Sequence, residues 1–214
     1  LHTLAHLQKN NKKLKCLFIS CEMGKIQLYK YMQRFPVFGC VKTLIASDFL
    51  NDNMKDVIEG LLKEGYDYIL IDSMAEMMES VREDNGMSLK EVEKWLIDLM
   101  ISHNLGGNDI GKNTTFIAIQ QVTKGGVFVG SNKLKHNTTG MLELRFEPDS
   151  GTQYLVFSKN RRGSVGKRMF YSLSETGDVQ YDLRRFSNDE NAREALSQER
   201  NLIESEASAF DKLI

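Results

Sequence analysis

The chain has 214 residues, which fits one large domain, or one domain followed by a tail. Hydrophobic residues make up 41% and charged residues 27%, so there is enough apolar material for a globular core. The formal net charge of -1 excludes a global basic field, and a nucleic acid would have to be bound by local basic patches. No apolar run approaches the roughly 20 residues of a membrane helix, so we expect no membrane partner.

The cysteines and histidines exclude two common kinds of site. Cys16, Cys21 and Cys40 form no C-x-x-C pair, which favours a reduced, cytoplasmic compartment over a disulfide scaffold. The four histidines show no spacing to cysteines or carboxylates that is typical of zinc ligands.

The first half of the chain alternates between helix and strand patterns. It opens inside a helical pattern at residues 1–9 that has no N-cap, so we expect a segment upstream of it. Ser88 and Glu91 form a capping-box pattern before a further helix. The patterns predict strands at 15–20, 41–45, 68–71 and 115–120, helices at 25–34, 52–64, 74–81 and from Ser88 to Met100, and a polar loop at 82–87. This alternation is typical of a parallel sheet with helices on both faces.

The pattern changes after residue 120. Short strand patterns joined by turn signals occur at 141–146, 153–158, 168–172 and 179–181. We therefore expect an α/β fold, with a mostly parallel twisted sheet, helices on both faces and an antiparallel β-hairpin extension at one edge. From Ser187 the chain is polar and charged, which predicts a core at residues 1–186 and a helical or disordered tail at 187–214.

The apolar strand pattern at 68–71 leads into Asp72 and Ser73. Ligands of open α/β sheets bind at the carboxyl ends of the strands, and an Asp there suits Mg²⁺ binding through a bound water. The plain alternative is a residue that starts a turn or caps the next helix, which is common. Alone, the pattern is weak support for a Mg²⁺-nucleotide site at Asp72 and Ser73.

Two other residues follow predicted strands, Glu22 and Gln121. A carboxylate at Glu22 could orient or deprotonate a water that attacks a γ-phosphate, although a surface Glu at a loop–helix junction is the simpler reading. A neutral amide at Gln121 could donate to a phosphate oxygen and report whether the γ-phosphate is present. The alternative for Gln121 is an ordinary polar residue at a strand end.

The segment 122–137 is rich in glycine and polar residues and carries Lys124, Lys133 and Lys135. Spaced lysines on a loop can follow a phosphate backbone, and Phe128 could contact bases or sugars. A plain surface loop explains the segment equally well.

Lys159 and Arg161 follow a predicted strand within Lys-Asn-Arg-Arg-Gly, at residues 159–163. If the strand continues through them, both side chains point to the same side. Two cations on one edge could reach the phosphates of a neighbouring subunit, as an arginine finger does in trans. A basic hairpin turn or a second nucleic-acid patch is the alternative.

These motifs, in this order, resemble the RecA-like ATPases, most of all the bacterial RadA (Sms) branch and then the DnaB replicative helicases. The RadA stretches V-T-K-E-G and L-E-H are similar to the V-T-K-G-G that begins at Val122 and to L-K-H at 134–136. The RadA signature K-N-R-F-G is similar to K-N-R-R-G at 159–163. The stretch L-F-I-S-C-E-M at 17–23 resembles the DnaB strand that ends in a catalytic Glu.

The resemblance implies a RecA-like ATPase core that uses ATP and Mg²⁺. It implies hydrolase and helicase-type activity in DNA repair, recombination or replication, in the cytoplasm of a bacterial or phage-infected cell. It also implies a homo-oligomer, a ring or a filament, whose sites are shared between subunits and which binds single-stranded DNA. The implied catalytic and nucleotide-binding residues are Glu22, Asp72, Ser73, Gln121, Lys159 and Arg161, and the implied DNA-binding residues are Lys124, Phe128, Lys133 and Lys135.

The chain also departs from this family. The phosphate-binding loop G-x-x-x-x-G-K-[ST] is absent from these 214 residues, so we expect the chain as it stands to bind ATP weakly. Gly125 and Arg162 stand where RadA has Glu and Phe. Two alternatives therefore stay open. One is a non-catalytic RecA-like scaffold that binds DNA or partner subunits regardless of ATP, and the other is a clock-type or signalling ATPase that acts on protein.

Overall fold

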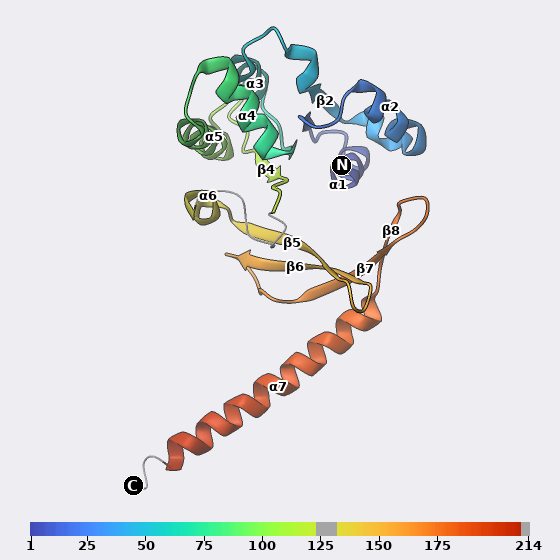
Figure 1. Cartoon of the computed structure of the whole chain (residues 1–214), viewed down its shortest axis with the longest axis vertical. Coiled ribbons are helices and arrows are strands. Elements are labelled where there is room, and N and C mark those ends of the chain that lie inside the picture. Colours follow the sequence, from blue (N-terminus) through green and yellow to red (C-terminus); the bar gives the residue numbers. More distant parts are fainter. Residues whose placement is uncertain (123–131, 211–214) are drawn as a thin grey trace. The chain divides into compact units, whose positions relative to one another are not determined.

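The computed structural model describes residues 1–122 and 132–210 (Figure 1). The chain forms two compact units, Leu1–Leu134 and Lys135–Ile214, and each is described by itself. The functional division expected between residues 186 and 187 stays a prediction. Within the described residues, no helix is long and apolar enough to cross a membrane.

The first unit is built on a four-stranded sheet with the order β2-β1-β3-β4. All three strand pairs are parallel, so the carboxyl ends of the strands meet at one edge. In the register of β1 and β3, Ser20 lies opposite Asp72. The strands are β1 (Cys16–Ser20), β2 (Lys42–Ile45), β3 (Tyr68–Asp72) and β4 (Thr115–Ala118). The predicted parallel α/β sheet is thereby confirmed.

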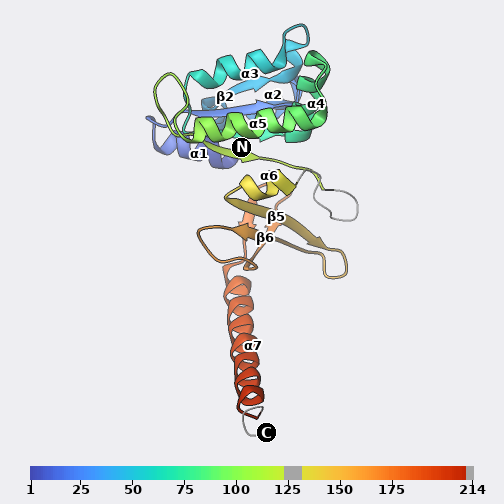
Figure 2. The same ribbon diagram turned by 90° about the vertical axis from the view of Figure 1, so that its left-hand side faces the viewer.

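Helices cover both faces of this sheet, which can be followed in Figure 2. They are α1 (His2–Asn10), α2 (Lys25–Arg34), α3 (Met54–Lys63), α4 (Met74–Asn85) and α5 (Leu89–Asn104), with short 3-10 turns η1 (Pro36–Cys40) and η2 (Ala46–Phe49). The predicted capping box before α5 is present, since the Ser88 N–H donates to Glu91 Oε2 at 2.8 Å and the Glu91 N–H donates to Ser88 Oγ at 3.3 Å. The loop predicted from residue 82 is wrong in its first part, because α4 continues to Asn85 and ends at Gly86 with a φ of 61°.

Alternating side chains of the central strand β1 divide the core into two clusters. Leu17 and Ile19 pack with buried residues of α3, α4 and α5. Cys16 and Phe18 point to the other face and pack with α1, α2 and η1. Strand β1 is buried along its whole length, as expected for a strand that is covered by helices on both faces.

The second unit contains an antiparallel sheet with the order β5-β6-β7-β8. Its strands are β5 (Gly140–Glu147), β6 (Thr152–Asn160), β7 (Arg168–Leu173) and β8 (Val179–Tyr181). The predicted hairpins are confirmed, and they form a second sheet of their own. Helix α6 (Asn132–Asn137) spans the division between the units, and α7 (Leu183–Phe210) follows the last strand.

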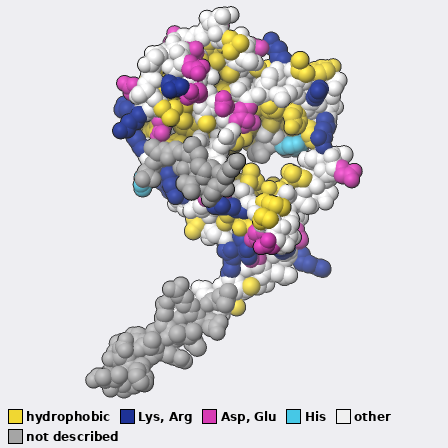
Figure 3. Space-filling view, viewed as in Figure 1, with side chains coloured by type: hydrophobic (Ala, Val, Ile, Leu, Met, Phe, Trp, Pro, Cys, Tyr) yellow, Lys and Arg dark blue, Asp and Glu magenta, His cyan; other side chains and the backbone are white. Residues whose placement is uncertain are grey.

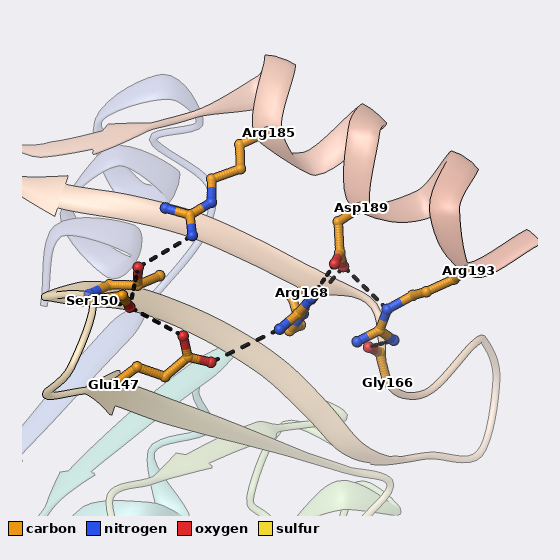
Figure 4. Close-up of polar contacts among 8 residues, drawn as sticks. Glu147, Ser150, Gly166, Arg168, Arg185, Asp189 and Arg193 are labelled. Atoms are coloured by element: carbon orange, nitrogen blue, oxygen red, sulfur yellow. Dashed lines mark hydrogen bonds and ion pairs between the residues drawn. The ribbon is translucent and has the colours of Figure 1, made fainter. Parts of the chain in front are cut away.

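Helix α7 is held to the antiparallel sheet by arginine side chains (Figure 4). Asp189 accepts hydrogen bonds from Arg168 on β7 and pairs with Arg193 one turn further along α7, at 3.1 Å. The hydrogen bond from Arg168 lowers the pKa of the Asp189 carboxyl. The Arg185 guanidinium lies 4.3 Å from the centre of the Phe170 ring and donates to Thr152 Oγ1 at 3.1 Å. These contacts fix the first part of α7 against β6 and β7.

A charged cluster closes the amino edge of the parallel sheet. Glu64 accepts hydrogen bonds from Lys42 at 2.8 Å, from Lys15 at 3.0 Å and from the Tyr66 hydroxyl at 3.0 Å. The hydrogen bond from Lys42, followed by that from Lys15, lowers the pKa of Glu64 to about 2. Gly65 follows with a φ of 70°, and a Cβ there would lie 2.7 Å from Ile110 Cγ1, so the chain can leave α3 in this conformation only with glycine at this position.

We expect Glu64→Gln to lower the free energy of unfolding by about 1 kcal/mol at pH 7, since a partly exposed ion pair contributes roughly that much. A carboxyl whose pKa is depressed on folding stabilises the folded state above its unfolded pKa, near 4.5, and this stabilisation is lost as the pH falls toward 2. Urea denaturation of both proteins from pH 7 to pH 3 should therefore show a difference that shrinks below pH 4.5. Exposed Glu83→Gln is the matched control. A difference that stays constant over this range would contradict the assignment.

Candidate functional site

Asp72 is placed at the carboxyl edge of the sheet by β3. It is the last residue of the strand, its carboxylate is half-buried, and its backbone carbonyl accepts the Cys21 N–H at 2.7 Å. The peptide bond between Asp72 and Ser73 is cis. Because β3 lies between β1 and β4, residues that follow either neighbouring strand lie beside Asp72.

Glu22 and Gln121 meet at this edge from the two neighbouring strands. Gln121 Nε2 donates a hydrogen bond to Glu22 Oε1 at 3.1 Å, across 99 positions of sequence. Pairing with β3 continues past β4, because the Ile119 N–H donates to the Ile71 carbonyl at 2.9 Å. Both side chains are exposed to solvent. The structure therefore brings Glu22, Asp72 and Gln121 together, while their catalytic roles stay predictions.

The electrostatics of this edge are dominated by carboxylates. Burial, and then the charge of Glu22, raises the pKa of Asp72. Burial, and then the charges of Asp72, Glu76 and Glu22, raises the pKa of the Cys21 thiol to about 12. We call Glu22, Asp72 and Glu76 the acidic corner. Its negative potential favours a bound cation.

The donor atoms of the acidic corner fit Mg²⁺ better than a metal held by protein alone. Within the described residues, no group of three or more His, Cys, Asp or Glu side chains could hold a metal ion. Mg²⁺ usually takes one or two carboxylates and completes its octahedron with water and substrate phosphates. Asp72 could supply such a carboxylate, with Glu22 close enough to contribute charge.

Ser73 is fully buried, and its hydroxyl caps α4 by accepting the Glu76 N–H at 3.5 Å. This is the helix-capping role that was the plain alternative for the Asp–Ser pair. A contact between Ser73 and a nucleotide stays a prediction.

Lys159 and Arg161 lie in the second unit, at the end of β6 and just beyond it. Both donate to the His136 carbonyl, Lys159 Nζ at 2.9 Å. Lys159 Nζ also donates to the Lys135 carbonyl. The strand does not continue through both residues, because β6 ends at Asn160 and Arg161 lies in the turn after it. The two cations nevertheless meet at the His136 carbonyl, and their role toward a neighbouring subunit stays a prediction.

The structure describes only two of the four residues that are expected to bind DNA. Lys133 and Lys135 are exposed on α6, whereas Lys124 and Phe128 lie outside the described residues. In the space-filling view, Lys and Arg side chains are interspersed with Asp and Glu and form no single large field (Figure 3).

Sequence reasoning missed two features of these sites. Glu76 and Cys21 belong to the electrostatics of the acidic corner, and their signal is available, since each lies within four residues of a predicted site residue. The main-chain carbonyls that accept hydrogen bonds from Lys159 and Arg161 have no signal in the sequence, because every residue carries such an acceptor.

Comparison with solved structures identifies the architecture. The chain is similar to a KaiC-like protein from the hyperthermophilic archaeon Pyrococcus horikoshii, with 12% identity and a TM-score of 0.50 over 83% of this chain and 80% of that one. It also resembles the RadB recombinase (16% identity, TM-score 0.49, 78% of each chain). A third similar structure is the flagellar accessory protein FlaH from Methanocaldococcus jannaschii (11% identity, TM-score 0.46, 84% of this chain and 80% of that one).

The likeness to the KaiC-like protein shows the fold and no more, because the sequences are so different. No family model matches the sequence, and no curated protein matches it. The chain therefore has a RecA-like α/β fold, and function has to be argued from the site.

Proposed function

We propose that this RecA-like chain is the ATP-hydrolysing part of an oligomeric DNA motor or recombination factor of the RadA/DnaB-like branch. The observation that carries the proposal is the meeting of Glu22, Asp72 and Gln121 at the carboxyl edge of one parallel sheet. The three residues lie at or just after the ends of three neighbouring strands, β1, β3 and β4, and this edge is where open α/β sheets bind their ligands.

Each of the three side chains has a role that its position suits. Asp72 would hold Mg²⁺ through a bound water, and Glu22 would orient the attacking water and accept its proton. When bound there, Mg²⁺ would neutralise charge that develops on the phosphates during transfer. Gln121 Nε2, which donates to Glu22 Oε1 at 3.1 Å, breaks this hydrogen bond when nucleotide binds and donates to a γ-phosphate oxygen instead.

A second subunit completes the site in this proposal. Lys159 and Arg161 carry fixed positive charges that neutralise the phosphates of a neighbour, which requires a ring or a filament. Single-stranded DNA contacts Lys124, Lys133 and Lys135 through its phosphates, and Phe128 contacts bases or sugars. Exposure of Lys133 and Lys135 supports this arrangement.

ATP hydrolysis by the intact gene product, measured with and without single-stranded DNA, tests the proposal. We expect turnover that rises several-fold with DNA, because contacts to the strand and to the γ-phosphate are linked through Gln121. The salt concentration should be held constant, since phosphate contacts weaken steeply with salt. Turnover that ignores DNA would contradict a DNA motor. DNA binding without any turnover would favour the non-catalytic RecA-like scaffold instead.

A further inference from the structure

The carboxyl end of α6 is held by two side chains from the end of β6. Lys159 Nζ donates to the carbonyls of Lys135 and His136, and Arg161 Nη2 donates to the carbonyl of His136. The Arg161 N–H also donates to the Thr139 carbonyl at 2.9 Å, which fixes the turn after the helix to the same strand end. The last carbonyls of a helix have no partner within the helix, so these cations act as its cap.

The surroundings of this cap carry an excess of positive charge. Desolvation, followed by the charges of Arg161 and Lys135, lowers the pKa of Lys159. Glu143 is the carboxylate that interacts with Lys135, but its own hydrogen bonds come from Ser158 and Arg145. The cations are thus bound to neutral carbonyls, and hydrogen bonds of this kind are weaker than those to an anion.

We infer that Lys159 and Arg161 exchange between two partners, the carboxyl end of α6 and a bound phosphate-type oxyanion, so that anion binding uncaps α6. The inference deepens the proposed function, on which it rests, by adding a regulatory step at the same two residues. An oxyanion within hydrogen-bond distance of both cations would place its oxygens against the carbonyls of Lys135 and His136. The ammonium of Lys159 has three N–H donors, and these carbonyls use two of them. A charged oxyanion is a stronger acceptor than a neutral carbonyl, so it competes with the carbonyls of α6 for both cations and draws them away from the helix end.

This exchange links anion binding to the chain that precedes β5. Helix α6 has six residues, too short to be stable in water by its own hydrogen bonds. Removal of two cationic caps from such a helix frays its last turn. The arrival of a phosphate at Lys159 and Arg161 is therefore reported at α6, which carries Lys133 and Lys135.

Amide hydrogen exchange of the 214-residue chain, with and without inorganic phosphate, tests the inference. Sodium chloride at matched ionic strength is the reference solution, and phosphate binding is followed separately by calorimetry. We expect phosphate to bind and to speed exchange at residues 134–137 at least fivefold. In Lys159→Ala/Arg161→Ala, exchange there should be fast from the start and unchanged by phosphate. Arg162→Ala, in the same turn, is the matched control and should behave as the parent chain.

Three outcomes would overturn the inference. The first is that phosphate does not bind. The second is that phosphate binds but amide exchange at α6 stays unchanged or slows. The third is that exchange in the double variant still changes when phosphate is added. None of these measurements involves hydrolysis, so they are separate from the test of the proposed function. If α6 is released by phosphate but the gene product shows no turnover, the exchange of partners stands and the motor proposal fails.

Discussion

Asp72→Asn is expected to lower ATP turnover by the intact gene product at least 100-fold, with DNA-stimulated and basal rates falling together. A carboxylate that positions a catalytic metal is worth several kcal/mol of transition-state stabilisation, which corresponds to at least this factor. Asparagine keeps the size of the side chain and removes its charge. The measurement is the steady-state rate at saturating ATP and Mg²⁺, with and without single-stranded DNA.

The same substitution should leave the fold intact, which separates loss of function from loss of structure. A carboxyl whose pKa is raised on folding destabilises the folded chain at neutral pH, and burial and Glu22 raise the pKa of Asp72. The variant should therefore unfold at the parent temperature or slightly above it. Asp67→Asn, just before the same strand at the opposite edge, is the matched control and should keep full turnover. Turnover within fivefold of the parent in Asp72→Asn would contradict the site.

Phe18→Ala is expected to lower the free energy of unfolding of the first unit by about 3–5 kcal/mol. Phe18 is 1% exposed in the central strand and packs in the cluster that joins α1, α2 and η1 to the sheet. Removing the ring loses its burial and leaves a cavity that a strand fixed on both sides cannot close. The transition can be followed in urea by the fluorescence of Trp95, the one tryptophan of the chain, which lies on α5.

Phe146→Ala is the control for this prediction. Phe146 lies on β5 and is 60% exposed, so its replacement should change the stability of the first unit by less than 0.5 kcal/mol, about the size expected for surface substitutions. A loss below about 1 kcal/mol in Phe18→Ala would mean that the helices of this face do not depend on Phe18.

Much of the first unit could be predicted from sequence because its strands are buried on both faces. Continuous apolar strand patterns that alternate with helical patterns are compatible with few sheet topologies. A helix between two strands carries the chain back across the sheet, so the next strand runs parallel to the first. The extent of α4 could not be predicted, since it depends on distant partners. Asp84 accepts the Met54 N–H at 2.9 Å, and Asn85 exchanges hydrogen bonds with Asn53, so the polar end of the helix is fixed by α3.

The candidate site was predictable in part for a similar reason. Residues that follow parallel strands must share an edge, which is enough to place Glu22 and Gln121 beside Asp72. The hydrogen bond between Gln121 and Glu22 and the raised pKa of Asp72 depend on side-chain conformations and burial, which the local sequence does not reveal. The attachment of Lys159 and Arg161 to main-chain carbonyls is unpredictable for the same reason.

The thiol of Cys21 gives the acidic corner a chemical property of its own. Peroxides, alkylating reagents and disulfides react with the thiolate, and a pKa of about 12 leaves about one Cys21 in 10⁵ ionised at pH 7. Burial, together with the carboxylates that attract a cation, thus keeps the neighbouring sulfur protonated and slows its oxidation. Exposed Cys40 lies outside this cluster of charge. A thiol-directed label can therefore be attached to this chain at Cys40 while the acidic corner stays unmodified.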